Sequence, residues 1–355
     1  MSALKERPGQ VRGRVLRTRG GLLSVRLDSR TAITVLGLAL AVFAAGAVSM
    51  TSGDYPLSVG EVVKTLFGFG DAGTEFIVTT LRLPRLLTAL LVGGALAVSG
   101  AILQSLTNNS LGSPDIVGFT EGSATGALLV IVIFHGGMLE VAAGALAAGL
   151  VTALVVALLA FKGGVQGFRL ILIGIGTSAM LVAANSYLIT RASVQDAYAA
   201  QAWLVGGLNG RGWEHVVPVA IALIVLLPLG FYYGTRLSLL EMGDDSAKGL
   251  GVPVERSRLV LIGVSVGLCA VATAAAGPIA FVALAAPQLA KRLTRSSGPG
   301  LTASALMGAL LLVVSDLATQ RLFPEEQLPV GVATGAIGGI YLIWLLSHEW
   351  RRGRG

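Results

Sequence analysis

The sequence predicts an all-α, polytopic membrane protein with about ten transmembrane helices. Of its 355 residues, 54% are hydrophobic and only 13% are charged, about half the charged fraction of a typical soluble domain. The mean hydropathy is +0.78, and the apolar residues fall in blocks of about 20, the length that an α-helix needs to cross a bilayer. A transmembrane β-barrel would instead show segments of about ten residues that alternate between apolar and polar, so helices are the predicted elements.

Polar or Gly/Pro-bearing gaps separate the apolar blocks. The first block follows a basic N-terminal segment, residues 1–31, and the last precedes a short tail, residues 348–355, which leaves 32–347 as the transmembrane domain. Ser113-Pro114-Asp115 introduces the third block, and only Gly277-Pro278 separates the seventh block from the short eighth. The predicted spans are residues 32–50, 82–106, 116–134, 139–161, 168–192, 216–236, 256–276, 278–293, 302–321 and 331–347.

The lysines and arginines predict how these spans are oriented. If the N-terminus is cytoplasmic, 20 of the 26 cationic residues lie on the inner side, as the positive-inside rule expects. Both termini are therefore expected in the cytoplasm. The net charge of +7 is explained by basic residues that face anionic membrane lipid, and it requires no nucleic-acid partner. The outer cations are Lys64, Arg82, Arg85, Arg191, Arg211 and Arg321.

The sequence contains no pattern typical of an enzyme. His135, His215 and His348 are scattered without metal-ligand spacing, so we expect no metal site. No G-x-x-x-x-G-K-[ST] loop is present, so the chain has no P-loop ATPase site of its own. The single cysteine, Cys269, lies within a span and excludes an internal disulfide. We therefore predict a protein that is not an enzyme, with no catalytic residue and no cofactor.

Two carboxylates lie a turn or more inside predicted spans, and a charge costs about 2.5–3.5 kcal/mol at the helix centre. Asp316 lies near the outer end of its span, so snorkelling or pairing with Arg321 could relieve the cost. Glu121 lies one turn into its helix, where the helix dipole favours an anion. We expect a structural role for both.

Rows of small residues predict close packing between helices. Such rows let helix backbones approach each other in a membrane, where no hydrophobic effect drives association. They fit a well-packed bundle, and a face of this kind could alternatively line a solute path or a subunit interface. The rows are Gly93, Ala97 and Ala101 in the second span and Gly331, Gly335 and Gly339 in the last.

Residues 239–252, LLEMGDDSAKGLGV, form a polar and acidic segment within the longest predicted cytoplasmic connection, residues 237–255. Asp244 and Lys248 have the spacing of an i,i+4 ion pair, and Gly249 and Pro253 can end a short helix. Exposed leucines beside exposed acids favour a groove on a partner protein over the anionic membrane surface, which would repel the acids.

Four blocks of this sequence resemble the iron-siderophore and cobalamin permeases of bacterial ABC importers, and they are most similar to G-type permease subunits of ferric enterobactin importers. The resemblance covers residues 32–347. The blocks are LRLPRLLTALLVGGALAVSGAILQSLTNNSLGSPDIVGF (81–119), LLEMGDDSAKGLGV (239–252), GPIAFVALAAPQLAKR (277–292) and QLPVGVATGAIGGIYLIWLL (327–346).

The resemblance implies a type II ABC importer permease fold in the cytoplasmic membrane and assigns roles to particular residues. The stretch that matches 239–252 couples the permease to an ATP-binding subunit. Arg82 and Arg85 match arginines that pair with glutamates of an extracytoplasmic substrate-binding lipoprotein or periplasmic protein. A second, related permease is expected to complete a heterodimer. The implied coupling residues are Leu239, Leu240, Glu241, Met242, Gly243, Asp244, Asp245, Lys248 and Gly249.

Several positions depart from the family pattern. Gln288 and Lys291 stand where P-H-I-A-R is common, Gln327 replaces a glutamate, and Ser110 replaces a proline. An outer arginine common four residues after the aspartate of the ninth span is replaced by Gln320. Arg321 is the next residue, about 100° away around an ideal helix, so it is given no docking role.

The expected function is import of a ferric siderophore, of the catecholate, enterobactin-like kind, driven by the partner ATPase. A cobalamin or heme importer permease is the alternative within the family. An ion-coupled secondary transporter should carry ionisable residues along its path, and a membrane scaffold would move no solute.

Overall fold

The computed structural model describes residues 14–17, 24–115, 117–160, 167–296, 298–322 and 328–352. Most of the predicted basic N-terminal segment, together with Lys162 and Gln327, lies outside the described residues. The only strands in the described part of the chain are β1 (Arg14–Arg17) and β2 (Ser24–Leu27), which pair as an antiparallel hairpin before the first helix.

All other regular structure in the described residues is helical, which confirms the predicted fold class. The helices are α1 (Ser29–Thr51), α2 (Val59–Leu66), α3 (Ala72–Glu75), η1 (Phe76–Arg82), α4 (Leu83–Thr107), α5 (Phe119–Leu129), η2 (Val130–Phe134), α6 (Met138–Ala160), α7 (Gly167–Arg191), α8 (Val194–Val205), α9 (Trp213–Leu240), α10 (Asp244–Gly249), α11 (Val254–Ala276), α12 (Val282–Thr294), α13 (Leu301–Leu322) and α14 (Val330–Arg352). Here η marks a π-helical stretch, a wider turn inside or beside an α-helix.

The ten predicted spans all correspond to helical segments. Seven helices in the described residues are long and apolar enough to cross a membrane. The shorter apolar segments Phe119–Phe134 and Val330–Trp344, together with α12, account for the other three. Helix α12 begins four residues after the predicted start at residue 278. The chain turns at Gly277 (φ +73°) and Phe281 (φ +67°) before that helix begins.

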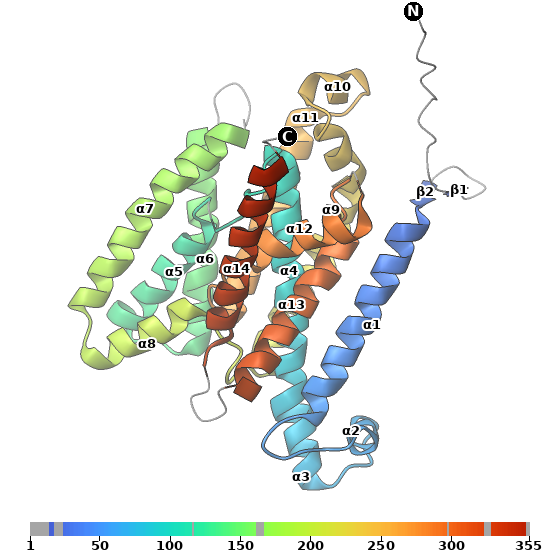
Figure 1. The fold of residues 1–355 in the computed structure, drawn as a ribbon. Helices are drawn as coiled ribbons and strands as arrows, with labels where there is room; N and C mark the ends of the chain where they lie inside the picture. The colour runs from blue at the N-terminus through green and yellow to red at the C-terminus, as the bar shows by residue number, and fades with distance from the viewer. Residues whose placement is uncertain are drawn as a thin grey trace, which may run out of the picture.

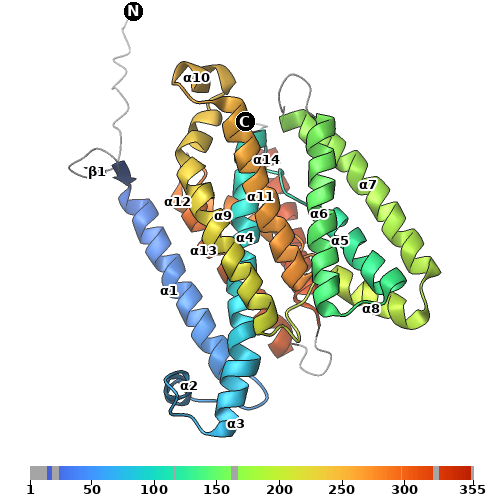
Figure 2. The same ribbon diagram turned by 180° about the vertical axis from the view of Figure 1, so that it is seen from behind.

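Helix α4 forms the centre of the bundle and packs against α9, α11, α12 and α13 (Figures 1 and 2). The predicted small-residue row in this helix is buried. A Cβ atom added at Gly93 would lie 2.4 Å from the carbonyl oxygen of Gly308, and one at Gly100 would lie 1.7 Å from that of Ala283. Glycine is required at both positions because the neighbouring backbone occupies the space of a side chain.

Buried polar groups join α4 to its neighbours by hydrogen bonds. The Ser99 and Ser265 hydroxyl oxygens lie 2.9 Å apart, and Gln104 Nε2 donates to the Leu284 carbonyl at 3.0 Å. Gln288 Nε2 donates to Gln104 Oε1 at 2.6 Å. Gln288, one of the departures from the family pattern, thus completes a polar contact inside the bundle, where an unpaired amide would be costly.

The two ends of the bundle differ. Helix α10, the start of α1 and the end of α14 lie at one end, called here the α10 end, and α2, α3 and α8 lie at the opposite end (Figure 1). These three short helices were not predicted from the sequence. The second span is also longer than predicted, since η1 and α3 continue α4 as one helical segment over Ala72–Thr107.

Candidate functional site

The segment 239–252 folds as a separate short helix, as predicted, between the ends of α9 and α11. Gly243 (φ +98°) and Gly251 (φ +79°) flank α10 in conformations that favour glycine. Ala247, within α10, is fully buried on the inner side of this helix. The result is a compact helical projection at the α10 end of the bundle (Figures 1 and 2).

Two ion pairs hold this projection on the bundle. Arg258 Nη2 of α11 donates to Asp244 Oδ1 at 2.7 Å, so Asp244 pairs with Arg258 and the predicted pair with Lys248 is wrong. Lys291 Nζ of α12 lies 3.4 Å from Glu241 Oε1. Sequence spacing could not show either contact, because the partners lie 14 and 50 residues apart. Two of the three acids predicted to face a partner protein therefore pair within the chain: Asp244 ties α10 to α11, and Glu241 ties the end of α9 to α12.

The predicted exposure of the two leucines is also corrected. Leu240 is 3% exposed and packs in the main core, and Leu239 is partly buried against the same core. The outward apolar side chains of this segment are Met242, 66% exposed, and Leu250, 63% exposed. Asp245 and Lys248 are exposed beside them. Helix α10 and the residues that flank it thus present two apolar side chains and two charges of opposite sign.

At the opposite end, Arg85 forms a bidentate ion pair with Asp316 of α13. Arg85 Nε lies 2.9 Å from Asp316 Oδ2 and Nη2 lies 2.8 Å from Oδ1. Gln320 Nε2 donates to Asp316 Oδ2 at 2.7 Å. The partner of Asp316 is therefore Arg85 and not Arg321, and the predicted structural role of Asp316 is supported. Gln320, another departure from the family pattern, completes this network.

Arg82 is fixed by backbone carbonyls. Its Nη1 donates to the Met50 carbonyl at 2.8 Å and its Nη2 to the Tyr55 carbonyl at 2.5 Å. It thereby satisfies a free carbonyl at the end of α1. Arg321, at the end of α13, is exposed. Of the three arginines, Arg321 presents its charge most openly.

Glu121 lies in the first turn of α5, as predicted. Asn185 Nδ2 of α7 lies 3.5 Å from Glu121 Oε2, and the nearby Thr120 hydroxyl donates to Asp115 Oδ1 at 2.6 Å. The described residues contain no group of three or more His, Cys, Asp or Glu that could hold a metal ion.

The glycine row of α14 divides between two environments. A Cβ at Gly331 would lie 1.7 Å from the Val205 carbonyl oxygen, so this end of the row packs within the chain. Gly335 and Gly339 have no atom within 4 Å of an added Cβ. These two positions form an open strip on the surface of α14.

Comparison with known proteins gives consistent results. The sequence profile of the FecCD transport family matches residues 25–348. The chain is 48% identical over 328 residues to the ferric enterobactin transport system permease protein FepG of Escherichia coli (strain K12), covering 92% of this chain and 99% of that protein. It is 38% identical over 322 residues to the probable siderophore transport system permease protein YfhA of Bacillus subtilis (strain 168), covering 88% and 93%.

The fold also matches a solved structure. A metal-chelate type ABC transporter in an inward-facing conformation superposes with a TM-score of 0.81 at 29% sequence identity, covering 89% of this chain and 99% of that one. The sequence blocks, the multi-pass helical architecture and this superposition agree. The chain is a member of the FecCD transport family of membrane permeases.

Proposed function

We propose that this chain is the permease subunit of an ABC importer that carries a ferric siderophore of the catecholate, enterobactin-like kind into the cytoplasm. The observation that carries the proposal is the 48% identity to a ferric enterobactin permease along 92% of this chain. Other similar proteins are named as siderophore and iron-citrate permeases, which favours an iron chelate over cobalamin or heme.

In this proposal the α10 end is cytoplasmic and α10 contacts an ATP-binding subunit. Met242 and Leu250 supply the apolar part of the contact surface, and Asp245 and Lys248 supply its charges. The pairs Asp244–Arg258 and Glu241–Lys291 transmit a displacement of α10 to α11 and α12. Because α9 runs directly into this segment, three membrane helices receive the movement that ATP binding and hydrolysis produce in the partner.

The opposite end receives an external substrate-binding protein. Arg82 and Arg85 contribute to this surface. Arg321, to which the family pattern gave no docking role, adds an exposed charge near Arg82. Part of the charge of Arg85 is offset by Asp316, so Arg82 and Arg321 contribute more of the attraction to acidic groups. Long-range attraction of this kind speeds association and weakens as salt is added.

A second, related permease completes the membrane unit. The open strip at Gly335 and Gly339 supports this part of the proposal, because glycines on an exposed face of a membrane helix allow another helix to approach closely. The solute then passes between the two permeases as their helices rearrange between outward- and inward-open states.

Uptake of radioactive iron tests the proposal. In cells that lack the chromosomal copy, a plasmid copy should restore uptake of ⁵⁵Fe-enterobactin, while uptake of ferric hydroxamates and of cobalamin should not depend on it. Met242→Ala with Leu250→Ala should lower this uptake at unchanged expression. Leu158→Ala, a truncation of an exposed side chain on α6, serves as the control.

Two results would contradict the proposal. Uptake that persists when cellular ATP is depleted but collapses when the proton gradient is removed would indicate an ion-coupled secondary transporter. Restored binding of a partner with no accumulation of any iron chelate would indicate a scaffold.

A further inference from the structure

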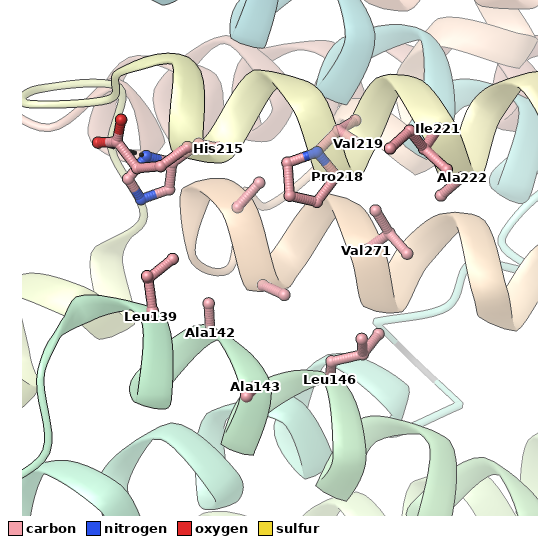
Figure 3. A pocket seen from close by; sticks show the side chains of 13 residues that line it. Leu139, Ala142, Ala143, Leu146, His215, Pro218, Val219, Ile221, Ala222 and Val271 are labelled. Atoms are coloured by element: carbon pink, nitrogen blue, oxygen red, sulfur yellow. Dashed lines mark ion pairs between the residues drawn. The ribbon is translucent and has the colours of Figure 1, made fainter.

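Helices α6, α11 and α9 lie side by side on one face of the molecule (Figure 2), and side chains from all three line a groove there. Helices α6 and α9 form its walls and α11 forms its floor, with a volume of about 530 Å³. Small side chains create the space, with Ala142 and Ala143 on α6, Ala222 on α9 and Ala274 on α11 (Figure 3). Its lining is almost entirely apolar.

The groove faces hydrocarbon in the proposed arrangement. It lies on the opposite side of the bundle from α14, whose open glycine strip we assign to the second permease (Figures 1 and 2). Exposed apolar side chains continue beyond the groove along both walls, including Leu150 on α6 and Ile224 on α9. Its lining on α6 runs from Leu139 to Leu146, about 11 Å along the helix axis, against a leaflet depth of about 15 Å.

One end of the groove is polar. Glu214 lines this end and its side chain is 51% exposed. Pro218 has no N–H, so the backbone carbonyl of Glu214, four residues earlier, lacks its usual helical donor. The residue at the mouth of the apolar groove therefore has two kinds of acceptor, a carboxylate and a backbone carbonyl without its usual helical donor.

A buried histidine lies beside the carboxylate. Arg211 Nη1 lies 3.0 Å from His215 Nε2, and because a guanidinium can only donate, Nε2 accepts and the proton of the neutral ring is on Nδ1. His215 Nδ1 lies 3.3 Å from Glu214 Oε1, with the histidine side chain only 2% exposed (Figure 3). Nδ1 makes no hydrogen bond within the described residues, so His215 contributes a close polar neighbour to Glu214 at the end of the groove.

We propose that this groove binds an acyl chain of an outer-leaflet phospholipid whose primary ammonium headgroup is held by Glu214. A primary ammonium carries three N–H donors and matches the two acceptors of Glu214, whereas the quaternary ammonium of choline has no N–H. An anionic glycerol headgroup would be repelled by the carboxylate. The proposal rests on the proposed orientation of the chain, and it does not depend on which iron chelate is carried.

Native mass spectrometry of the purified transporter tests this site. Phosphatidylethanolamine, phosphatidylcholine and phosphatidylglycerol with identical acyl chains are added at equal concentration. The ethanolamine lipid should be retained about two- to fivefold more than the other two, the range expected of a half-exposed ion pair. Glu214→Gln should abolish this preference, and Glu140→Gln, an exposed acid on α6 outside the groove lining, should keep it.

Variants that fill the groove with larger side chains provide an independent test of the lipid site. Ala143→Leu and Ala222→Leu come from opposite walls and should each lower total lipid retention, whereas Ala147→Leu, exposed on α6 outside the lining, should not. Equal retention of the three lipids by the unaltered chain, or undiminished retention in both filled variants, would overturn the proposal. If either of these results were obtained while siderophore uptake stayed normal, the lipid proposal would fail and the transport proposal would stand. Retained lipid preference without uptake would contradict only transport.

Discussion

Removing one partner of the ion pair between Arg85 and Asp316 should lower the free energy of unfolding by several kcal/mol. The Asp316 side chain is 5% exposed and that of Arg85 is 25% exposed. Removing one member of a buried pair typically costs 3–5 kcal/mol because the other charge is left unpaired. In Arg85→Ala, Asp316 would keep only the hydrogen bond from Gln320 at 2.7 Å and that from any water that enters. Since Arg85 is partly solvated, we expect the lower limit, about 3 kcal/mol.

The single cysteine provides the assay. Cys269 is 1% exposed on α11, which packs against α4, the helix that carries Arg85. A maleimide dye in excess reacts with this thiol only when the bundle opens, so the labelling rate follows the population of open molecules. About 3 kcal/mol corresponds to roughly a hundredfold faster labelling of Arg85→Ala.

A double variant separates the ion pair from other causes. Arg85→Met with Asp316→Leu removes both charges, and it should label within about tenfold of the unaltered chain because apolar replacement of a buried pair is often neutral. Arg321→Ala, at an exposed position, should change labelling little. If Arg85→Ala labelled at the unaltered rate, or the double variant were no slower than the single one, the assigned structural role of Arg85 would be refuted.

Four further predictions follow from particular contacts. Gly100→Ala should prevent stable folding, because the new Cβ would meet the Ala283 carbonyl oxygen, whereas Gly335→Ala, in open space, should fold normally by the same thiol assay; equal labelling of the two would contradict the packing. Asp244→Asn should raise amide hydrogen exchange across α10 by breaking the contact with Arg258, while Asp245→Asn, at an exposed neighbour, should not; equal exchange would show that the pair does not hold α10. Charge reversal of Arg82 and Arg321 to Glu should weaken binding of the substrate-binding protein and reduce the salt dependence of the association rate; unchanged affinity would remove these residues from the contact surface. The Ser58 backbone N–H and then its hydroxyl lower the pKa of Glu61 from its ordinary value of 4.5, so the charged form stabilises α2 above that value and the stabilisation is lost as pH falls through the lowered pKa. Amide exchange in α2, measured relative to the intrinsic exchange rate at each pH, should rise in acid more for the unaltered chain than for Glu61→Gln. Parallel profiles would contradict this.

The spans could be predicted because bilayer thickness imposes a length on each apolar block, whatever the helices pack against. Short helices outside the membrane carry no such constraint. Helix α2 was not predicted, although Ser58 and Glu61 form a capping box that the sequence displays. The two residues of the capping box lie three positions apart in the polar connection between apolar blocks, so this helix start is visible in the sequence.

The partners of charged residues could not be predicted, because they depend on contacts distant in sequence. Asp244 was assigned to Lys248 on the basis of helical spacing, yet Arg258 approaches it from the next helix. For Asp316 the sequence offered snorkelling or pairing with nearby Arg321, yet Arg85, 231 residues away, forms the pair. A local rule finds the nearest candidate along the chain, whereas a buried charge pairs with the cation that tertiary packing brings to it.

The exposure of Leu240 illustrates the same limit. A leucine in a polar connection is indistinguishable by sequence from Met242 two residues later, and the orientation of the last turn of α9 decides that Leu240 faces the core while Met242 faces outward. The short helix was predicted correctly from the sequence, whereas the side chains that it turns outward could be identified only from the structure.

The most direct test of the coupling proposal is mass spectrometry of the complex purified in mild detergent from the native membrane. The unaltered chain should bring with it a P-loop ATPase and a second, related permease. Met242→Asp with Leu250→Asp should lose the ATPase and keep the second permease, with Cys269 still protected from labelling. If the folded, unaltered chain were recovered alone and reproducibly, or if the ATPase were retained in full by the double variant, the proposed role of α10 would be contradicted.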